Sequence, residues 1–194
     1  MSTQEQSVDL VDASTALALA RVALFAALAG AFAFVSFEYP LSPAPVTLQV
    51  LAVFLAGLFL GPVWGAVSMG VYLVAGAVGL PVFANATAGV GVLFGPTGGY
   101  LLSYPLAAGV IGYVAHGGPE VRSLDEVGVP RLVAALVAGV VVIYTLGAAG
   151  LMAFGGLGLE AAVVGGAVVF LPAEAVKLAA AVGIARSDDV AMDA

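Results

Sequence analysis

Six long apolar stretches constrain this chain more than any other feature of its sequence. They fall at residues 16–37, 46–61, 63–80, 99–115, 131–152 and 161–185. A helix needs about 20 apolar residues to cross a bilayer, and these stretches are too long and too uncharged for the helices of a soluble core. Only 9% of the residues are charged, against about 25% in soluble domains. The sequence therefore predicts an all-α membrane protein with six transmembrane helices.

The chain is expected to form one transmembrane domain between two short tails. Residues 1–15 are polar and acidic and lack the basic start of a signal peptide, so they are expected to stay on the mature chain as a cytoplasmic tail. Residues 16–186 would form the six-helix domain, and residues 187–194 a second cytoplasmic tail. Only Gly61-Pro62 separates the second stretch from the third, which predicts a tight turn and an antiparallel helical hairpin.

The arginines predict the orientation of the domain in the cell membrane. They lie at the start of the first stretch, on both sides of the loop between the fourth and fifth stretches, and after the sixth: Arg21, Arg122, Arg131 and Arg186. Six crossings place all of them on one side, which the positive-inside rule assigns to the cytoplasm together with both termini. The outer side then receives the loops at residues 38–45, 81–98 and 153–160.

The composition argues against several kinds of site. A formal net charge of -7 is unfavourable for nucleic-acid binding, which needs clustered lysine and arginine. The absence of cysteine excludes disulfides and thiolate metal sites. The single histidine, His116, stands beside two glycines in an expected loop. We therefore expect no metal site and no cofactor.

The second outer connection is unusual because residues 81–98 are hydrophobic and also rich in glycine. At membrane depth, irregular backbone is tolerated only where it is buried in protein or lines a cavity. We expect this segment, which is neither a linker nor a helix, to fold over the bundle as a cap, with glycines that let the backbone approach a ligand. A tight surface turn beside the membrane is the alternative.

An acid and the only lysine occur inside the last apolar stretch. Glu174 and Lys177 are three residues apart, so they share one helix face. Charges at the membrane centre cost about 2.5 to 3.5 kcal/mol each, and they normally mark a functional site. The alternative is a pair that neutralises itself and only locks the helix. Pro172 favours a new helix start just before the pair, with a break at Gly165-Gly166.

Other polar side chains interrupt the apolar sequence near the same outer end. They are Gln49, Asn85, Thr87, Tyr39, Tyr72, Tyr100, Tyr104 and Tyr144. Individually, the tyrosines are expected at membrane interfaces, and Gln49 is equally suited to joining helices. Together they predict a small polar pocket with apolar walls.

Four strings of the sequence resemble the BioY family, the biotin-binding S components of energy-coupling-factor (ECF) vitamin transporters. They are Pro45-Val46-Thr47-Leu48-Gln49, Gly79-Leu80-Pro81-Val82-Phe83, Gly95-Pro96-Thr97-Gly98-Gly99-Tyr100-Leu101 and Pro172-x-Glu174-x-x-Lys177. The resemblance runs from about residue 16 to 186. It implies the S-component fold, with a glycine-rich capping loop between helices 3 and 4. It also implies a binding subunit, not an enzyme, that captures biotin outside and passes it inward with a transmembrane T component and two cytoplasmic ATPases.

The resemblance also implies roles for individual residues. Lys177 would meet the biotin carboxylate or its hydrogen-bond network, and Glu174 the ureido N–H groups. Glu174 replaces the family's usual aspartate, and residues 85–88 interrupt its glycine-rich loop. The full set of expected substrate contacts is Lys177, Glu174, Asn85, Thr87, Gln49 and Tyr100.

A row of small side chains follows the first stretch at helical spacing: Ala16, Ala20, Ala23 and Ala27. Such rows permit close helix packing. The resemblance implies that Ala23 and Ala27 contact the T component, and packing inside the chain is the alternative.

Two other functions stay open at this point. One is an S component for another carboxylate-bearing vitamin. The other is a membrane-embedded enzyme that uses Glu174 and Lys177 as acid and base, although no nucleophile and base set accompanies them. The sequence also leaves open whether the subunit works alone as a homo-oligomer or only with energising partners.

Overall fold

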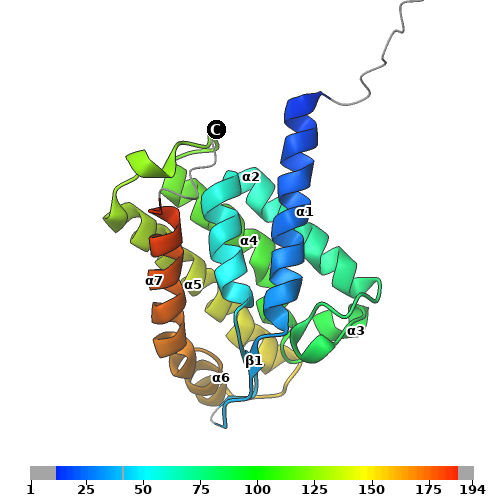
Figure 1. The fold of residues 1–194 in the computed structure, drawn as a ribbon. Helices are drawn as coiled ribbons and strands as arrows, with labels where there is room; N and C mark the ends of the chain where they lie inside the picture. The colour runs from blue at the N-terminus through cyan, green and yellow to red at the C-terminus, as the bar shows by residue number, and fades with distance from the viewer. Residues whose placement is uncertain (1–11, 41, 188–194) are drawn as a thin grey trace, which may run out of the picture.

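The computed structural model describes residues 12–40 and 42–187, which form a helical bundle (Figure 1). Its α-helices are α1 (Ala13–Ala33), α2 (Gln49–Ala77), α3 (Val90–Leu93), α4 (Gly98–His116), α5 (Val129–Ala153), α6 (Leu159–Gly166) and α7 (Leu171–Ala185). Two short antiparallel strands, β1 (Ser36–Phe37) and β2 (Val46–Thr47), and the 3-10 turns η1 (Ala84–Ala86), η2 (Leu124–Glu126) and η3 (Val168–Phe170) complete it. Five helical stretches of the described chain are long and apolar enough to cross a membrane.

The second of these stretches, α2, contains the predicted hairpin. Gly61 has a φ of 73° and a ψ of -173°, which breaks the helix, and Pro62 follows. The chain reverses direction there, as Figure 1 shows near the label α2. Beyond the turn, a Cβ atom on Gly65 would lie 2.9 Å from the carbonyl oxygen of Ala56, so the two arms touch through their backbones. The hairpin is confirmed, and it turns the five stretches into six crossings.

Glycines allow other helices to approach closely as well. Helix α4 packs between α2 and α5. A Cβ atom on Gly99 would lie 2.2 Å from the carbonyl oxygen of Leu146 and 2.9 Å from the Cα atom of Gly150. A Cβ atom on Gly112 would lie 2.4 Å from the nitrogen of Pro62. Small residues at such contacts are the usual means by which transmembrane helices pack.

The arginines gather at one end of the bundle. The Arg186 guanidinium, at the end of α7, donates to the carbonyl oxygens of Asp125 and Val127. The Arg131 Nε donates to the carbonyl oxygen of Val114 at 2.8 Å. The N-terminus of α1, the helix that carries Arg21, points toward the same end in Figure 1. Arg131 and Arg186 thus lie at one end of the bundle, which we call the arginine end.

His116 does not lie in a loop, as the sequence suggested, but is the last residue of α4 and only 1% exposed. Its Nδ1 accepts the backbone N–H of Arg122 at 3.1 Å, so its Nε2 carries the proton and donates to the carbonyl oxygen of Leu58 at 2.9 Å. In a continuous helix that oxygen would be bonded by residue 62, and Pro62 has no N–H. The imidazole therefore supplies the donor that the hairpin turn lacks.

The first helix begins and ends a few residues before the first apolar stretch does. Helix α1 already begins at Ala13, because the Asp12 carboxylate accepts the backbone N–H of Thr15 at 3.3 Å and caps the helix. The same helix ends at Ala33 instead of residue 37, since the next residues pair as strand β1. The rest of the two predicted tails, residues 1–11 and 188–194, lies outside the described residues.

We expect His116→Ala to lower the free energy of unfolding by about 1–3 kcal/mol, because it leaves the buried Leu58 carbonyl without a donor. Thermal unfolding in detergent measures the change. Tyr113→Ala is the matched control. It removes a larger side chain from the same helix, and that side chain is 58% exposed. Equal melting temperatures for the two variants would contradict the role of His116.

Candidate functional site

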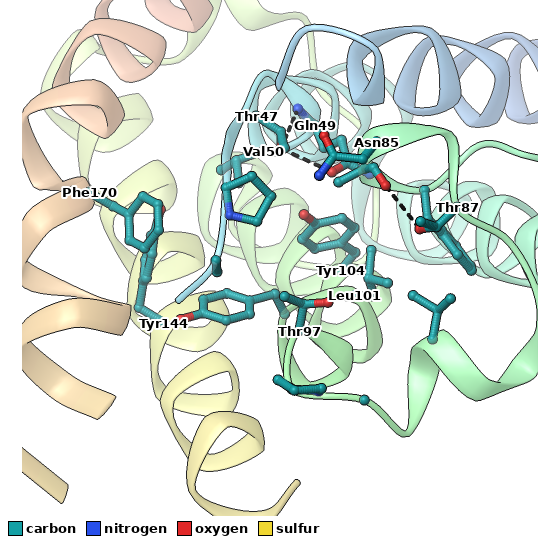
Figure 2. Close-up of a pocket in the computed structure, with 18 of the residues that line it drawn as sticks. Thr47, Gln49, Val50, Asn85, Thr87, Thr97, Leu101, Tyr104, Tyr144 and Phe170 are labelled. Carbon is teal, nitrogen blue, oxygen red and sulfur yellow. Dashed lines mark hydrogen bonds between the residues drawn. The ribbon is translucent and has the colours of Figure 1, made fainter. Parts of the chain in front are cut away.

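A cavity of about 280 Å³ opens at the end of the bundle opposite the arginines. The segment before α2, the start of α2, the loop after it, and helices α4, α5 and α7 all contribute to its wall. Figure 2 shows Phe170 and Tyr144 on one side of the cavity, and Gln49, Asn85 and Thr87 on the other. The lining residues are Ala44, Pro45, Thr47, Gln49, Val50, Phe83, Ala84, Asn85, Thr87, Val92, Gly95, Pro96, Thr97, Tyr100, Leu101, Tyr104, Tyr144, Phe170 and Lys177. Apolar walls with a few converging polar groups are typical of small-molecule sites.

The structure brings most of the predicted contacts together in this cavity. Gln49, Asn85, Thr87, Tyr100 and Lys177 all line it. Glu174 is the exception, since it lies behind the wall and is 3% exposed. Their contact with a substrate stays a prediction.

The loop between α2 and α4 lines the cavity. The sequence predicted no helix in this loop, and that prediction is wrong. It contains η1 and the single turn α3. An isolated bridge between Phe83 and Thr87 closes a turn in which Asn85 and Ala86 have φ values of 58° and 55°. The ring of Phe83 packs so tightly on Gly76 that a Cβ atom there would lie 2.1 Å from it. The loop is thus a folded element with a fixed attachment to α2.

The sequence predicted that the glycines of this loop let its backbone approach a ligand, and not all of them lie where they could do so. Gly95 does line the cavity. By contrast, a Cβ atom on Gly98 would lie 1.9 Å from the carbonyl oxygen of Leu93. Together with the approach of Gly99 to α5, this contact shows that these two glycines bring protein backbones together.

The last apolar stretch is broken where the sequence predicted. Helix α6 ends at Gly166, η3 follows, and Pro172 occupies the first turn of α7. Proline is favoured at this position because the first helical N–H groups have no intrahelical acceptor. The break turns Phe170 into the cavity wall and places Lys177 within reach of it.

Lys177 and Glu174 form a buried ion pair. The Lys177 Nζ donates to the Glu174 Oε1 at 2.6 Å, and the two side chains are 5% and 3% exposed. The Tyr144 hydroxyl donates to the same oxygen at 2.7 Å. The structure therefore contains the ion pair of the alternative interpretation, and Lys177 lines the cavity as well.

The interfacial position expected for the tyrosines is wrong for several of them. Tyr72, Tyr104 and Tyr144 are buried, whereas Tyr39 is 43% exposed. The ring of Tyr144 lies 5.5 Å from Phe170 and 5.9 Å from Tyr100, and the ring of Tyr72 lies 6.3 Å from Tyr104. Tyr100, Tyr104, Tyr144 and Phe170 line the cavity, and we call their rings its aromatic wall.

The set of expected substrate contacts omits four aromatic residues of the cavity lining: Phe83, Tyr104, Tyr144 and Phe170. Tyr104 and Tyr144 did belong to the polar residues that together predicted the pocket, whereas Phe83 and Phe170 did not. One signal was available, since residues four apart share a helix face and Tyr104 follows the predicted Tyr100 by four.

Gln49 joins parts of the chain, as the alternative interpretation required, and also lines the cavity. Its Oε1 accepts the Thr47 hydroxyl at 3.0 Å, and its Nε2 donates to the Tyr72 hydroxyl across the hairpin. The Tyr72 hydroxyl in turn donates to the carbonyl oxygen of Val82 at 3.1 Å. These bonds connect both arms of α2 to the start of the loop.

Comparison with known proteins identifies the family. The family model for BioY matches residues 3–192. The chain belongs to the BioY family. A relative described as a probable biotin transporter BioY, from Pyrococcus horikoshii, is 39% identical over 165 residues, which cover 85% of this chain and 91% of the relative. The biotin transporter BioY of Thermotoga maritima is 42% identical over 129 residues, which cover 66% of this chain and 70% of the relative.

A solved structure confirms the predicted fold class of this BioY-family chain. It is the S-component for biotin from an ECF-type ABC transporter, with a TM-score of 0.81 and 24% sequence identity. The match covers 91% of this chain and 93% of that chain. The chain is therefore a multi-pass membrane protein with the S-component fold. The relatives are named as transporters, which gives no support to the enzyme considered above.

The alanine row lies on the surface of α1. Ala16, Ala20, Ala23 and Ala27 are all exposed. The row therefore does not pack inside the described chain, which removes that alternative and leaves it open to lipid or to a partner.

We expect Lys177→Met to be strongly destabilising, by about 3–5 kcal/mol, because it leaves the buried Glu174 carboxylate without its cation. The double variant Lys177→Met, Glu174→Gln removes both charges and should recover much of that loss. Thermal unfolding of both variants in detergent gives the comparison. A double variant no more stable than the single one would show that the pair does not behave as a coupled buried ion pair.

Proposed function

We propose that this chain is the substrate-binding and translocating subunit for biotin uptake. It captures biotin at the outer face and moves it inward with an ATP-driven ECF module. The observation that carries the proposal is the cavity, in which aromatic walls separate two groups of polar side chains. The names of the relatives support biotin as the substrate.

The chemistry of the cavity suits biotin. Its aromatic wall offers apolar surface to the bicycle and the aliphatic chain of the vitamin. Tyr144 stands at one side of the cavity, and Asn85 and Thr87 at the other (Figure 2). Lys177 lies beside Tyr144, because both donate to the same Glu174 oxygen. Biotin likewise carries a polar group at each end, a ureido group with two N–H donors and one carbonyl acceptor, and an anionic carboxylate.

The ion pair supports a choice of orientation. Because Lys177 Nζ and Glu174 Oε1 are 2.6 Å apart, the two residues stand at the same end of the cavity. We therefore assign both residues to the same end of the ligand, instead of dividing them between its carboxylate and its ureido group. A lysine that is already paired with an acid, beside the Tyr144 oxygen as an acceptor, suits the neutral ureido group better than an anion. The carboxylate then lies toward Asn85, Thr87 and the N-terminus of α4, where the helix dipole favours negative charge.

The orientation predicts how substrate analogues bind. Wild-type protein should bind radiolabelled biotin saturably in detergent. The double variant Lys177→Met, Glu174→Gln should lose at least about ten-fold in affinity, the value of one or two hydrogen bonds to charged groups. It should lose the same factor for biotin amide, which lacks the carboxylate charge. A loss confined to biotin would place Lys177 at the carboxylate instead.

Two controls complete this experiment. Glu38→Gln removes an exposed acid outside the cavity lining and should bind like wild type. Competition by other carboxylate-bearing vitamins tests the second candidate, an S component for one of these. Stronger competition by another vitamin than by unlabelled biotin would favour it. Absence of saturable biotin binding to wild-type protein would refute the proposed function.

The proposed topology places the cavity outside and the arginine end in the cytoplasm with both termini. Arg122, Arg131 and Arg186 support it through the positive-inside rule. The exposed alanines of α1 offer a flat surface on which a transmembrane helix can pack closely. We assign Ala23 and Ala27 to contact with the T component, which connects this chain to two cytoplasmic ATPases.

Replacing Ala23 and Ala27 with leucine should prevent co-purification of the T component and the ATPases with this chain from membranes that contain all four subunits. Bulky side chains keep the two backbones apart. Biotin binding by the isolated variant should equal that of wild type, because neither residue lines the cavity. Ala20→Leu on the neighbouring turn tests how far the surface extends. Undiminished co-purification of the double variant would remove these two residues from the interface.

A further inference from the structure

Two phenol hydroxyls of the cavity wall already donate hydrogen bonds to other groups of the protein. The Tyr100 hydroxyl donates to the carbonyl oxygen of Gly166 at 2.5 Å. A carbonyl oxygen can only accept, so the direction of this bond is fixed. The Tyr144 hydroxyl donates to the Glu174 Oε1 at 2.7 Å. A carboxylate also only accepts, and the Lys177 ammonium on the same oxygen favours this charged form.

A phenol whose one proton is already engaged in a hydrogen bond can only accept a hydrogen bond from a ligand. Tyr144 lines the cavity, and its ring is held between Phe170 and Tyr100, with centroid distances of 5.5 Å and 5.9 Å. Rotation of the ring away from Glu174 would disturb both contacts. The oxygen of Tyr144 is therefore held in a fixed position, where it can only accept.

Glu174 acts from behind this wall. It does not line the cavity, and its Oε1 accepts from two residues that do, Lys177 and Tyr144. Its Oε2 is buried and has no hydrogen-bond partner in the described part of the chain. One carboxylate oxygen thus sets the direction of the hydrogen bonds that two cavity residues can make.

We propose that Glu174 is a positioning residue and that Tyr144, fixed by it as an acceptor, selects substrates with an N–H donor at this end of the cavity. The proposal rests on the proposed function, since it takes the ureido group of biotin as that donor. Tyr104 provides a contrast. Its hydroxyl also lines the cavity but has no hydrogen-bond partner among the described residues, so it is free to donate or accept.

The test measures selectivity as well as affinity. The probes are biotin and its two cyclic carbamate analogues, in which a ring oxygen of similar size replaces one or the other ureido N–H. Tyr144→Phe should weaken biotin binding about ten-fold, the value of one hydrogen bond to a buried acceptor. It should leave unchanged the affinity for the analogue that lacks the N–H facing Tyr144. Competition against radiolabelled biotin in detergent gives all of these affinities.

Glu174→Gln tests the positioning role separately. A neutral amide oxygen accepts a weaker hydrogen bond than a carboxylate oxygen, so it holds the Tyr144 proton less firmly and lets the hydroxyl also donate toward the cavity. The preference for biotin over that analogue should fall about ten-fold, as one hydrogen bond is lost. The double variant Glu174→Gln, Tyr144→Phe should show no further loss of preference beyond Tyr144→Phe alone. Tyr113→Phe, on an exposed residue of α4, is the matched control and should keep the wild-type preference.

The possible outcomes separate the two proposals. Failure of wild-type protein to bind biotin refutes the proposed function. Wild-type binding, with Tyr144→Phe weakening biotin and both analogues by one common factor, overturns the selective role of Tyr144 alone. An unchanged preference in Glu174→Gln overturns its positioning role.

Discussion

In lipid, every backbone polar group must find its partner within the protein, and the architecture of this BioY-family chain depends on this constraint. Continuous helices meet it by themselves, but each helix break exposes carbonyl groups that need another donor. A side chain supplies that donor at two important breaks. His116 bonds the Leu58 carbonyl at the hairpin turn, and Tyr100 bonds the Gly166 carbonyl at the end of α6. The breaks are thus stabilised by side chains from α4.

The same breaks create the cavity. In one continuous helix through α6 and α7, regular helical geometry would fix the direction of the Phe170 side chain. The break frees it from that geometry, and it lies in the cavity wall. The break after Gly166 and the new start beside Pro172 bring a helix N-terminus, an acid and a lysine to one place. The Tyr100 bond that satisfies this break also belongs to the aromatic wall, so the stability of the fold and the shape of the site depend on the same contact.

The charged side chains also have structural roles. A buried ion pair contributes little to stability by itself, because desolvation offsets most of the attraction. Here the ion pair matters because it fixes the direction of the hydrogen bonds that neighbouring side chains can make. Glu174 accepts from Lys177 and Tyr144 and leaves their remaining hydrogen-bonding capacity toward the cavity. Other charged contacts gather at the arginine end, where Arg131 and Arg186 bond backbone carbonyls around the connecting loop.

The sequence alone determined the features that follow from local rules. Apolar length gave the spanning stretches, Gly61-Pro62 the hairpin, and Pro172 the start of the last helix, because these depend on neighbouring residues only. The motif that contains Lys177 also indicated the correct family and fold.

The tertiary structure decided which side chains meet. The sequence placed Tyr104 and Tyr144 at an interface and His116 in a loop, whereas the structure buries all three. Packing also decided that Glu174 lies outside the cavity lining, where it bonds Lys177 and Tyr144. The physical reason is the solvent. A helix that faces lipid is apolar on all sides, so it lacks the polar stripe that reveals the buried face of a helix in water. Only packing against the other helices determines which of its faces points inward.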